Sequence, residues 1–190
     1  MKYRTDIDLW KSLKSGDLAS FEYIYHANYK DLFYYGLKLS GKRDVTEDCI
    51  HDLFVQMWAN REVINEVHSL KPYLLKCFRR RLFKMVSQGD VAVCDNPLGR
   101  NEHLLSRSAE DNIIEGESVY ERKKIVLSAM KSLTKRQREA IHLRYFMGFD
   151  NKEICAVMNL QYQTIRNLIC EGIKALRFEI EQPAASRYQS

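Results

Sequence analysis

Apolar residues recur at three- and four-residue spacing through the first 86 positions of the chain, as on one face of an α-helix. The pattern predicts four amphipathic helices, which run from Thr5 to Ser15, over about 18–39, over about 45–59 and from near Leu70 onward. Pro72 fits the first turn of the fourth helix, where its missing N–H costs nothing. The residues expected to face the core are Ile7, Leu9, Trp10, Leu13, Phe21, Ile24, Tyr25, Leu32, Phe33, Leu37, Ile50, Leu53, Phe54, Met57, Trp58, Leu75, Phe78, Leu82 and Met85.

A second helical block begins near Val119. Thr134 and Gln137 have the spacing of a capping box, a reciprocal pair of hydrogen bonds at the start of a helix. The apolar positions of this helix are Ala140, Ile141, Leu143 and Tyr145. Gly148 is a plausible end for it, and the tail at 181–190 is expected to be disordered. Because neither block contains a convincing strand pattern, we predict an all-α protein made of two small helical domains.

The segment from Asp150 to Arg177 has the pattern of a helix-turn-helix, with helices over 151–158 and 163–180. Asn159 occupies the turn position that needs a left-handed backbone, which asparagine tolerates better than most residues. The inward positions are Ile154, Val157, Met158, Leu160, Ile165, Leu168, Ile169, Ile173 and Leu176. The positions offered to DNA bases are Gln161, Tyr162, Gln163, Arg166 and Asn167, with Lys174 and Arg177 placed for phosphates. An ordinary antiparallel helix pair with a polar outer face would give a similar pattern.

Charge divides the chain into three parts. Residues 1–86 carry 15 Lys/Arg and 11 Asp/Glu (+4), residues 87–118 carry 2 and 7 (−5), and residues 119–190 carry 13 and 7 (+6). The middle part also lacks sustained periodicity, so we predict an acidic linker between two basic domains. Basic domains suit nucleic acid, although solubilising surface charge is the simpler reading of these totals.

Two helices of the first block have charged outer faces. On the third helix the outer face is acidic and amide-rich, and it could dock a basic partner helix: Glu47, Asp48, His51, Asp52, Val55 and Gln56. On the fourth helix five cations lie within nine residues: Lys76, Arg79, Arg80, Arg81 and Lys84. Tyr73 and Phe83 add aromatic surface on which unstacked bases could stack. For both helices the alternative is an ordinary solvated face.

Several other classes of protein lack support in the sequence. The five cysteines are Cys49, Cys77, Cys94, Cys155 and Cys170; they include no C-x-x-C pair, and four of them fall in apolar-patterned segments as expected for small core residues. The five histidines are scattered, and no phosphate loop or nucleophile motif occurs. We therefore expect no metal, no cofactor, no small-molecule substrate and no enzyme activity. With no apolar leader or long apolar run, we expect a cytoplasmic protein.

The order and spacing of these features resemble the sigma-70 family, in its extracytoplasmic-function (ECF) branch. The resemblance covers about 9–86 and 119–180, and it is carried by GDLASFEYIYHANYKDLFYYGLKL, TEDCIHDLFVQMW, SLKPYLLKCFRRRLF and LTKRQREAIHLRYFMGFDNKEICAVMNLQYQTIRNLICEGIKALR. The wording QYQTIRNLI resembles members from Bacteroidetes that are paired with iron-citrate-type signalling systems. The chain departs from the family's usual residues at His51 (commonly Gln), Arg80 (Asn), Thr134 (Pro) and Asn159 (Gly).

The resemblance implies a role for each part of the chain. Residues 1–86 would be sigma region 2, 87–118 the linker and 119–180 sigma region 4. Region 2 would bind the β′ clamp helices of core RNA polymerase through Asp48, His51, Asp52 and Gln56. Its Asn60–Ser69 loop would capture a flipped base of the −10 element, and the strand would lie along Tyr73, Lys76, Arg79, Arg80, Phe83 and Lys84. Region 4 would read the −35 element through Gln161, Tyr162, Gln163, Arg166, Asn167 and Lys174.

The same resemblance implies the partners: core polymerase, including the β flap, promoter DNA and a membrane-linked anti-sigma factor. The free factor would be a monomer. The acidic linker suggests a further hypothesis, in which it lies in the basic channel of the polymerase as a nucleic-acid mimic. Neutralising Glu110, Asp111, Glu115 and Glu117 should then weaken core binding. Two other interpretations remain: a stand-alone helix-turn-helix regulator with a sensory N-terminal domain, and a helical adaptor that binds only proteins.

Overall fold

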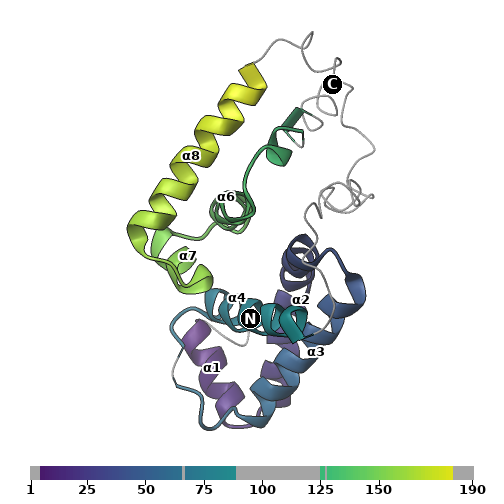
Figure 1. Cartoon of the computed structure of the whole chain (residues 1–190). Helices are drawn as coiled ribbons and strands as arrows, with labels where there is room; N and C mark the ends of the chain where they lie inside the picture. Colours follow the sequence, from purple (N-terminus) through teal and green to yellow (C-terminus); the bar gives the residue numbers. More distant parts are fainter. Residues whose placement is uncertain (1–4, 66, 89–124, 127, 182–190) are drawn as a thin grey trace, which may run out of the picture. The chain divides into compact units, whose positions relative to one another are not determined.

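The computed structural model describes residues 5–65, 67–88, 125–126 and 128–181, and every regular element within these ranges is helical. The all-α prediction is therefore confirmed for the described part of the chain. Two compact units are present (Figure 1). The first contains α1 (Asp6–Lys14), α2 (Leu18–Ser40), α3 (Arg43–Ala59) and α4 (Leu70–Gln88). The second contains α6 (Lys135–Ile141), the π-helical turn η4 (His142–Phe146), α7 (Asn151–Met158) and α8 (Tyr162–Glu181). The predicted acidic linker falls almost wholly on residues 89–118, outside the described residues, as does the tail after Glu181.

The helix ends follow the local signals of the sequence. The Thr5 hydroxyl accepts a hydrogen bond from the Asp8 N–H (3.1 Å) and caps α1. Helix α2 ends at Gly41, whose φ of 67° is the left-handed conformation that glycine adopts without strain. Both hydrogen bonds of the predicted Thr134–Gln137 capping box are present at the start of α6. The predicted helix boundaries therefore agree with the structure to within about two residues.

The core of the first unit lies where α2 packs against its three neighbours. Helices α1, α2 and α4 each contribute side chains that are almost completely buried here: Trp10, Leu13, Ile24 and Phe78. Tyr35 is also buried, although it was not among the predicted core residues. Helix α2 contacts α1, α3 and α4, so it is buried on more than the single face that an amphipathic pattern reveals.

Some residues read as core lie elsewhere. Ile7 and Tyr145 are exposed, and Met85 is part-buried while its neighbour Val86 is buried. Of the cysteines read as core, Cys49 is buried, Cys77 and Cys155 are part-buried, and Cys170 is exposed. The interpretation of all four as core residues is therefore wrong for Cys170, which is a small residue at the edge of an apolar stripe.

Arg138, on α6, holds the chain segment that precedes this helix. Its guanidinium donates hydrogen bonds to the main-chain carbonyls of Met130 (3.0 Å), Lys131 (3.4 Å) and Leu133 (2.9 Å). Partial burial of this guanidinium lowers the pKa of Arg138. Further along, Arg144 donates to the Phe149 carbonyl (3.0 Å) across the turn at Gly148. These bonds fix the segments that lead into α7.

Candidate nucleic-acid and protein interfaces

Helices α7 and α8 form the predicted helix-turn-helix. A capping box starts α7: the Asp150 carboxylate accepts from the Glu153 N–H (2.8 Å), and the Glu153 carboxylate accepts from the Asp150 N–H (2.9 Å). Ile154 is fully buried, which holds α7 to the rest of the unit. Asn159 ends α7 with φ 54° and ψ 50°, the left-handed conformation expected from the sequence. The turn therefore presents the N-terminal end of α8 at the surface.

The residues predicted to read DNA bases share one exposed surface on α8 and the residue before it. The exposed side chains are Gln161, Tyr162, Gln163, Arg166 and Asn167. The Gln163 side-chain amide donates to the side-chain oxygen of Asn167 (3.1 Å), so these two amides orient each other. The Asn151 amide also donates to the Tyr162 hydroxyl (3.4 Å), which links α7 to this surface. Lys174 is exposed further along α8.

Helix α4 presents three cations to solvent. Lys76, Arg80 and Lys84 are exposed at four-residue intervals. Because side chains four residues apart lie on one helix face, they form a basic stripe. Arg79 is part-buried, and its guanidinium lies over the Phe83 ring, 4.6 Å from the centroid. We call Lys76, Arg79, Arg80, Phe83 and Lys84 the α4 basic stripe.

Tyr73 differs from the rest of the predicted α4 set. It is part-buried, and its ring makes an edge-to-face contact with Trp10 at 5.6 Å between centroids. Burial raises the pKa of Tyr73. The nearby Cys77 thiol, which hydrogen bonds with Tyr73, raises this pKa further. Its ring is therefore engaged in packing between α4 and α1, whereas Phe83 is more open to solvent.

The outer face of α3 is acidic and amide-rich, as predicted. Its exposed side chains, which we call the α3 face, are Asp48, His51, Asp52, Val55 and Gln56. Glu47 is part-buried and forms an ion pair with Arg43 one turn earlier (3.0 Å). Val55 is 51% exposed at the middle of this face.

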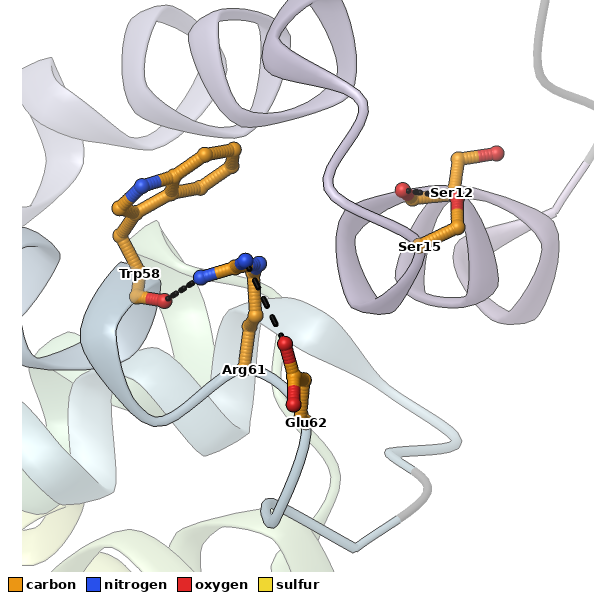
Figure 2. A network of polar contacts seen from close by, with 5 residues as sticks. All are labelled: Ser12, Ser15, Trp58, Arg61 and Glu62. Atoms are coloured by element: carbon orange, nitrogen blue, oxygen red, sulfur yellow. Dashed lines mark hydrogen bonds and ion pairs between the residues drawn. The ribbon is translucent and has the colours of Figure 1, made fainter.

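Arg61 holds the loop between α3 and α4 through contacts that the sequence did not predict. Figure 2 shows Arg61 beside the Trp58 indole; the guanidinium lies 4.7 Å from the ring centroid and donates to the Trp58 carbonyl (2.9 Å). Its other end lies 3.4 Å from a Glu62 carboxylate oxygen. In the same view Ser15 donates to the Ser12 carbonyl (2.8 Å) and closes the end of α1.

Helix α1 anchors the middle of this loop and the start of α4. The Lys14 ammonium donates to the Ile64 carbonyl (2.9 Å), and the Asp6 carboxylate accepts from the Leu70 N–H (2.9 Å) at the start of α4. These contacts join residues 50 and 64 positions apart, so no short-range pattern could indicate them. The loop is therefore positioned by contacts with α1 as well as by the contacts of its own Arg61.

In the described ranges no group of three His, Cys, Asp or Glu side chains is placed to hold a metal ion. None of the helices described is both long and apolar enough to cross a membrane.

Comparisons with known proteins agree on one family. Residues 123–176 match the family model described as "Sigma-70, region 4". The chain is 23% identical over 180 residues to the ECF RNA polymerase sigma factor SigK of Mycobacterium sp. (strain JLS), covering 91% of this chain and 90% of that protein. It is 18% identical over 173 residues to SigL of Mycobacterium tuberculosis, covering 91% and 96% of the two chains.

Solved structures show the same fold. The structure of CnrH in complex with the cytosolic domain of CnrY matches with a TM-score of 0.59 and 16% identity, over 97% of this chain and 99% of that one. The sigma factor RpoE in complex with the anti-sigma factor NepR from Bartonella quintana matches with a TM-score of 0.58 and 20% identity, over 85% and 96%.

Proposed function

We propose that the chain is a member of the sigma-70 family in its ECF branch, and that it acts as a transcription initiation factor through the contacts described below. It binds DNA and directs core RNA polymerase to promoters. The observation that carries this function is the helix-turn-helix of α7 and α8, with its polar N-terminal surface on α8, inside the segment that matches sigma-70 region 4. We assign 1–86 to region 2, 87–118 to the linker and 119–180 to region 4.

The α8 surface reads the −35 element. Arg166 is an exposed guanidinium, which suits a bidentate contact to guanine, and the mutually bonded Gln163 and Asn167 suit adenine. Gln161 and Tyr162 lie at the same end of the helix, and Lys174 lies further along to meet a phosphate. This arrangement separates sequence reading from backbone binding along one helix.

The first unit opens and holds the −10 element. The Asn60–Ser69 loop captures a flipped base, and the α4 basic stripe holds the strand behind it, with Tyr73 packed at its N-terminal end. The anchoring of the loop by Lys14 and Asp6 supports this assignment, since a base pocket needs a loop of fixed shape.

Protein partners occupy other surfaces. The α3 face docks on the β′ clamp helices through Asp48, His51, Asp52 and Gln56, and region 4 meets the β flap. The solved relatives are complexes with CnrY and with the anti-sigma factor NepR. We accordingly propose a membrane-linked anti-sigma factor for this chain, a cytoplasmic site of action and, more narrowly, a Bacteroidetes iron-citrate-type signalling system.

Run-off transcription tests the proposal. The full chain is mixed with core RNA polymerase and its own upstream promoter. Arg166→Ala and the double variant Arg80→Ala/Lys84→Ala are each expected to reduce the specific transcript, the first through the loss of about 1–3 kcal/mol of base recognition. The matched controls, Arg136→Ala and Lys11→Ala/Lys30→Ala, remove the same charges from exposed sites outside the proposed surfaces: Arg136, Lys11 and Lys30.

If the transcription assay fails, a different function is indicated. A folded chain that neither co-elutes with core nor yields a transcript, yet binds a −35-like duplex tightly by itself, is a stand-alone helix-turn-helix regulator. Unchanged transcription in Arg166→Ala would remove α8 from promoter recognition.

A further inference from the structure

Arg81 leaves its basic neighbours on α4 and contacts α3. One guanidinium nitrogen donates a hydrogen bond to the Gln56 side-chain oxygen, and the other lies 3.8 Å from a carboxylate oxygen of Asp52. The Arg81 side chain is 21% exposed, whereas that of Asp52 is 56% exposed. Arg81 therefore lies beneath the α3 face, and its two partners remain open to a binding protein.

The position of Arg81 is itself constrained. Its Nε atom is buried and has no hydrogen-bond partner in the described residues. Its charge also acts on the buried thiol of Cys49, where it opposes the rise in pKa that burial causes. Because its side chain is only 21% exposed, Arg81 has little space to leave its contacts on α3.

These contacts determine what the α3 face offers a partner. Asp52 and Gln56 lie four residues apart, on successive turns of one helix face. The planar fork of arginine can bond two acceptors at a fixed spacing. Because the Gln56 oxygen already accepts from Arg81, its NH₂ group is left to donate outward. The second carboxylate oxygen of Asp52 is left to accept.

We propose that Arg81 is a positioning residue for polymerase recognition, which holds Asp52 and Gln56 in the arrangement that core RNA polymerase binds. The inference rests on the proposed function, in which the α3 face docks on the polymerase. It adds a role for a cation of α4 that neither touches promoter DNA nor the polymerase. It also links the polymerase-binding face directly to the helix that carries the α4 basic stripe.

Equilibrium binding of the labelled full chain to core RNA polymerase, without DNA, tests the inference. Arg81→Met keeps the length and packing of the side chain, and we expect it to weaken binding about tenfold, equivalent to about 1.4 kcal/mol. Gln56→Ala should cause a similar loss, and the double variant should lose little more, because both changes break the same contact. Arg81→Lys keeps the charge near Asp52 but not the fork, so its loss should be smaller.

Lys71→Met is the matched control. Lys71 also sits on α4 and pairs with a carboxylate of another helix, Asp31 on α2 (2.7 Å), away from the α3 face. It should leave core affinity unchanged. If Arg81→Met melts at a lower temperature than this control, the role of Arg81 is tested with Arg81→Lys, with Gln56→Ala and with the variant that combines these two changes, by comparing their core affinities.

Three results would overturn the inference. Unchanged affinity in Arg81→Met would mean that Arg81 does not organise the α3 face, and additive losses in the double variant would mean the same. Tighter binding would mean that Arg81 masks the face instead. If the unaltered chain fails to bind core polymerase, the proposed function fails, which is a separate outcome.

Discussion

Replacing Gly36 with alanine tests the packing on which the first unit depends. Gly36 is buried near the C-terminal end of α2, where the helix approaches both α3 and α4. A Cβ atom at this position would lie 2.5 Å from Cζ of Phe78 and 2.6 Å from Cγ2 of Thr46. Ordinary contacts between carbon atoms are about 3.5–4.0 Å, so both neighbours would have to move by about 1 Å.

Neither neighbour can move easily. Phe78 is fully buried, and its ring has no space to enter. The Thr46 hydroxyl donates to the Lys42 carbonyl (2.7 Å) and lies 3.1 Å from the Ser40 hydroxyl, so rotating its methyl group would break a buried network. Overpacking of a core costs about 1–3 kcal/mol, and two constrained neighbours favour the upper end. Alanine in a helix recovers about 1 kcal/mol relative to glycine, which leaves a net loss of about 2 kcal/mol.

Tryptophan fluorescence measures this loss. The chain's two tryptophans, Trp10 and Trp58, lie in α1 and α3, so their signal reports on the first unit. For a unit of this size, 2 kcal/mol should lower the melting temperature by roughly 10 °C. Gly148→Ala is the control, because it strains a turn of the second unit (φ 75°) without meeting any atom within 4 Å. An unchanged or raised tryptophan-detected midpoint in Gly36→Ala would show that the three helices are not packed this closely.

Three other predictions concern single contacts. Asn159→Ala should destabilise the second unit by about 1 kcal/mol in urea unfolding, because alanine tolerates φ 54° poorly, while Asn159→Gly should not; equal stabilities would contradict the left-handed turn. Asp6→Ala should cost the first unit about 1 kcal/mol by removing the acceptor of the Leu70 N–H, with a smaller loss in Asp6→Asn, which keeps an oxygen there. Burial raises the pKa of Cys49 to about 12, so the thiol stays protonated, and iodoacetamide at about pH 8 should modify exposed Cys170 before Cys49; mass spectrometry showing equal rates for these two residues in the native chain would refute this.

The parts of the fold that could be predicted depend on signals within a few residues. The cap at Thr5, the capping box at Thr134 and the left-handed turn at Asn159 each act over one helical turn, and the structure confirms all three. Tyr35 could not be assigned to the core because α2 is covered by three helices, and a single-face pattern describes a helix covered on one side.

The candidate surfaces were predictable only as faces of single helices. Lys84 and Arg81 are three residues apart and equally basic, yet one is exposed and the other reaches α3. That difference depends on how α4 packs against α3, which no property of α4 alone determines. Tyr73 shows the same limit: its spacing suits the basic stripe, but Trp10 from α1 lies against its ring.

Helix α4 therefore joins three kinds of contact in one rigid element. Its apolar side, with Phe78 and Leu82, is buried in the core, its exposed side carries the basic stripe, and Arg81 reaches the α3 face between them. Since α2, α3 and α4 meet at van der Waals distance around Gly36, a shift of α4 that left α3 in place would need space that the core lacks. A displacement of the α3 face would then be transmitted to α4 and its basic stripe rather than absorbed between them. The packing at Gly36 and the contacts of Arg81 both hold α4 against its neighbours, so under the proposed function we expect that loosening either weakens the response of DNA melting to polymerase binding.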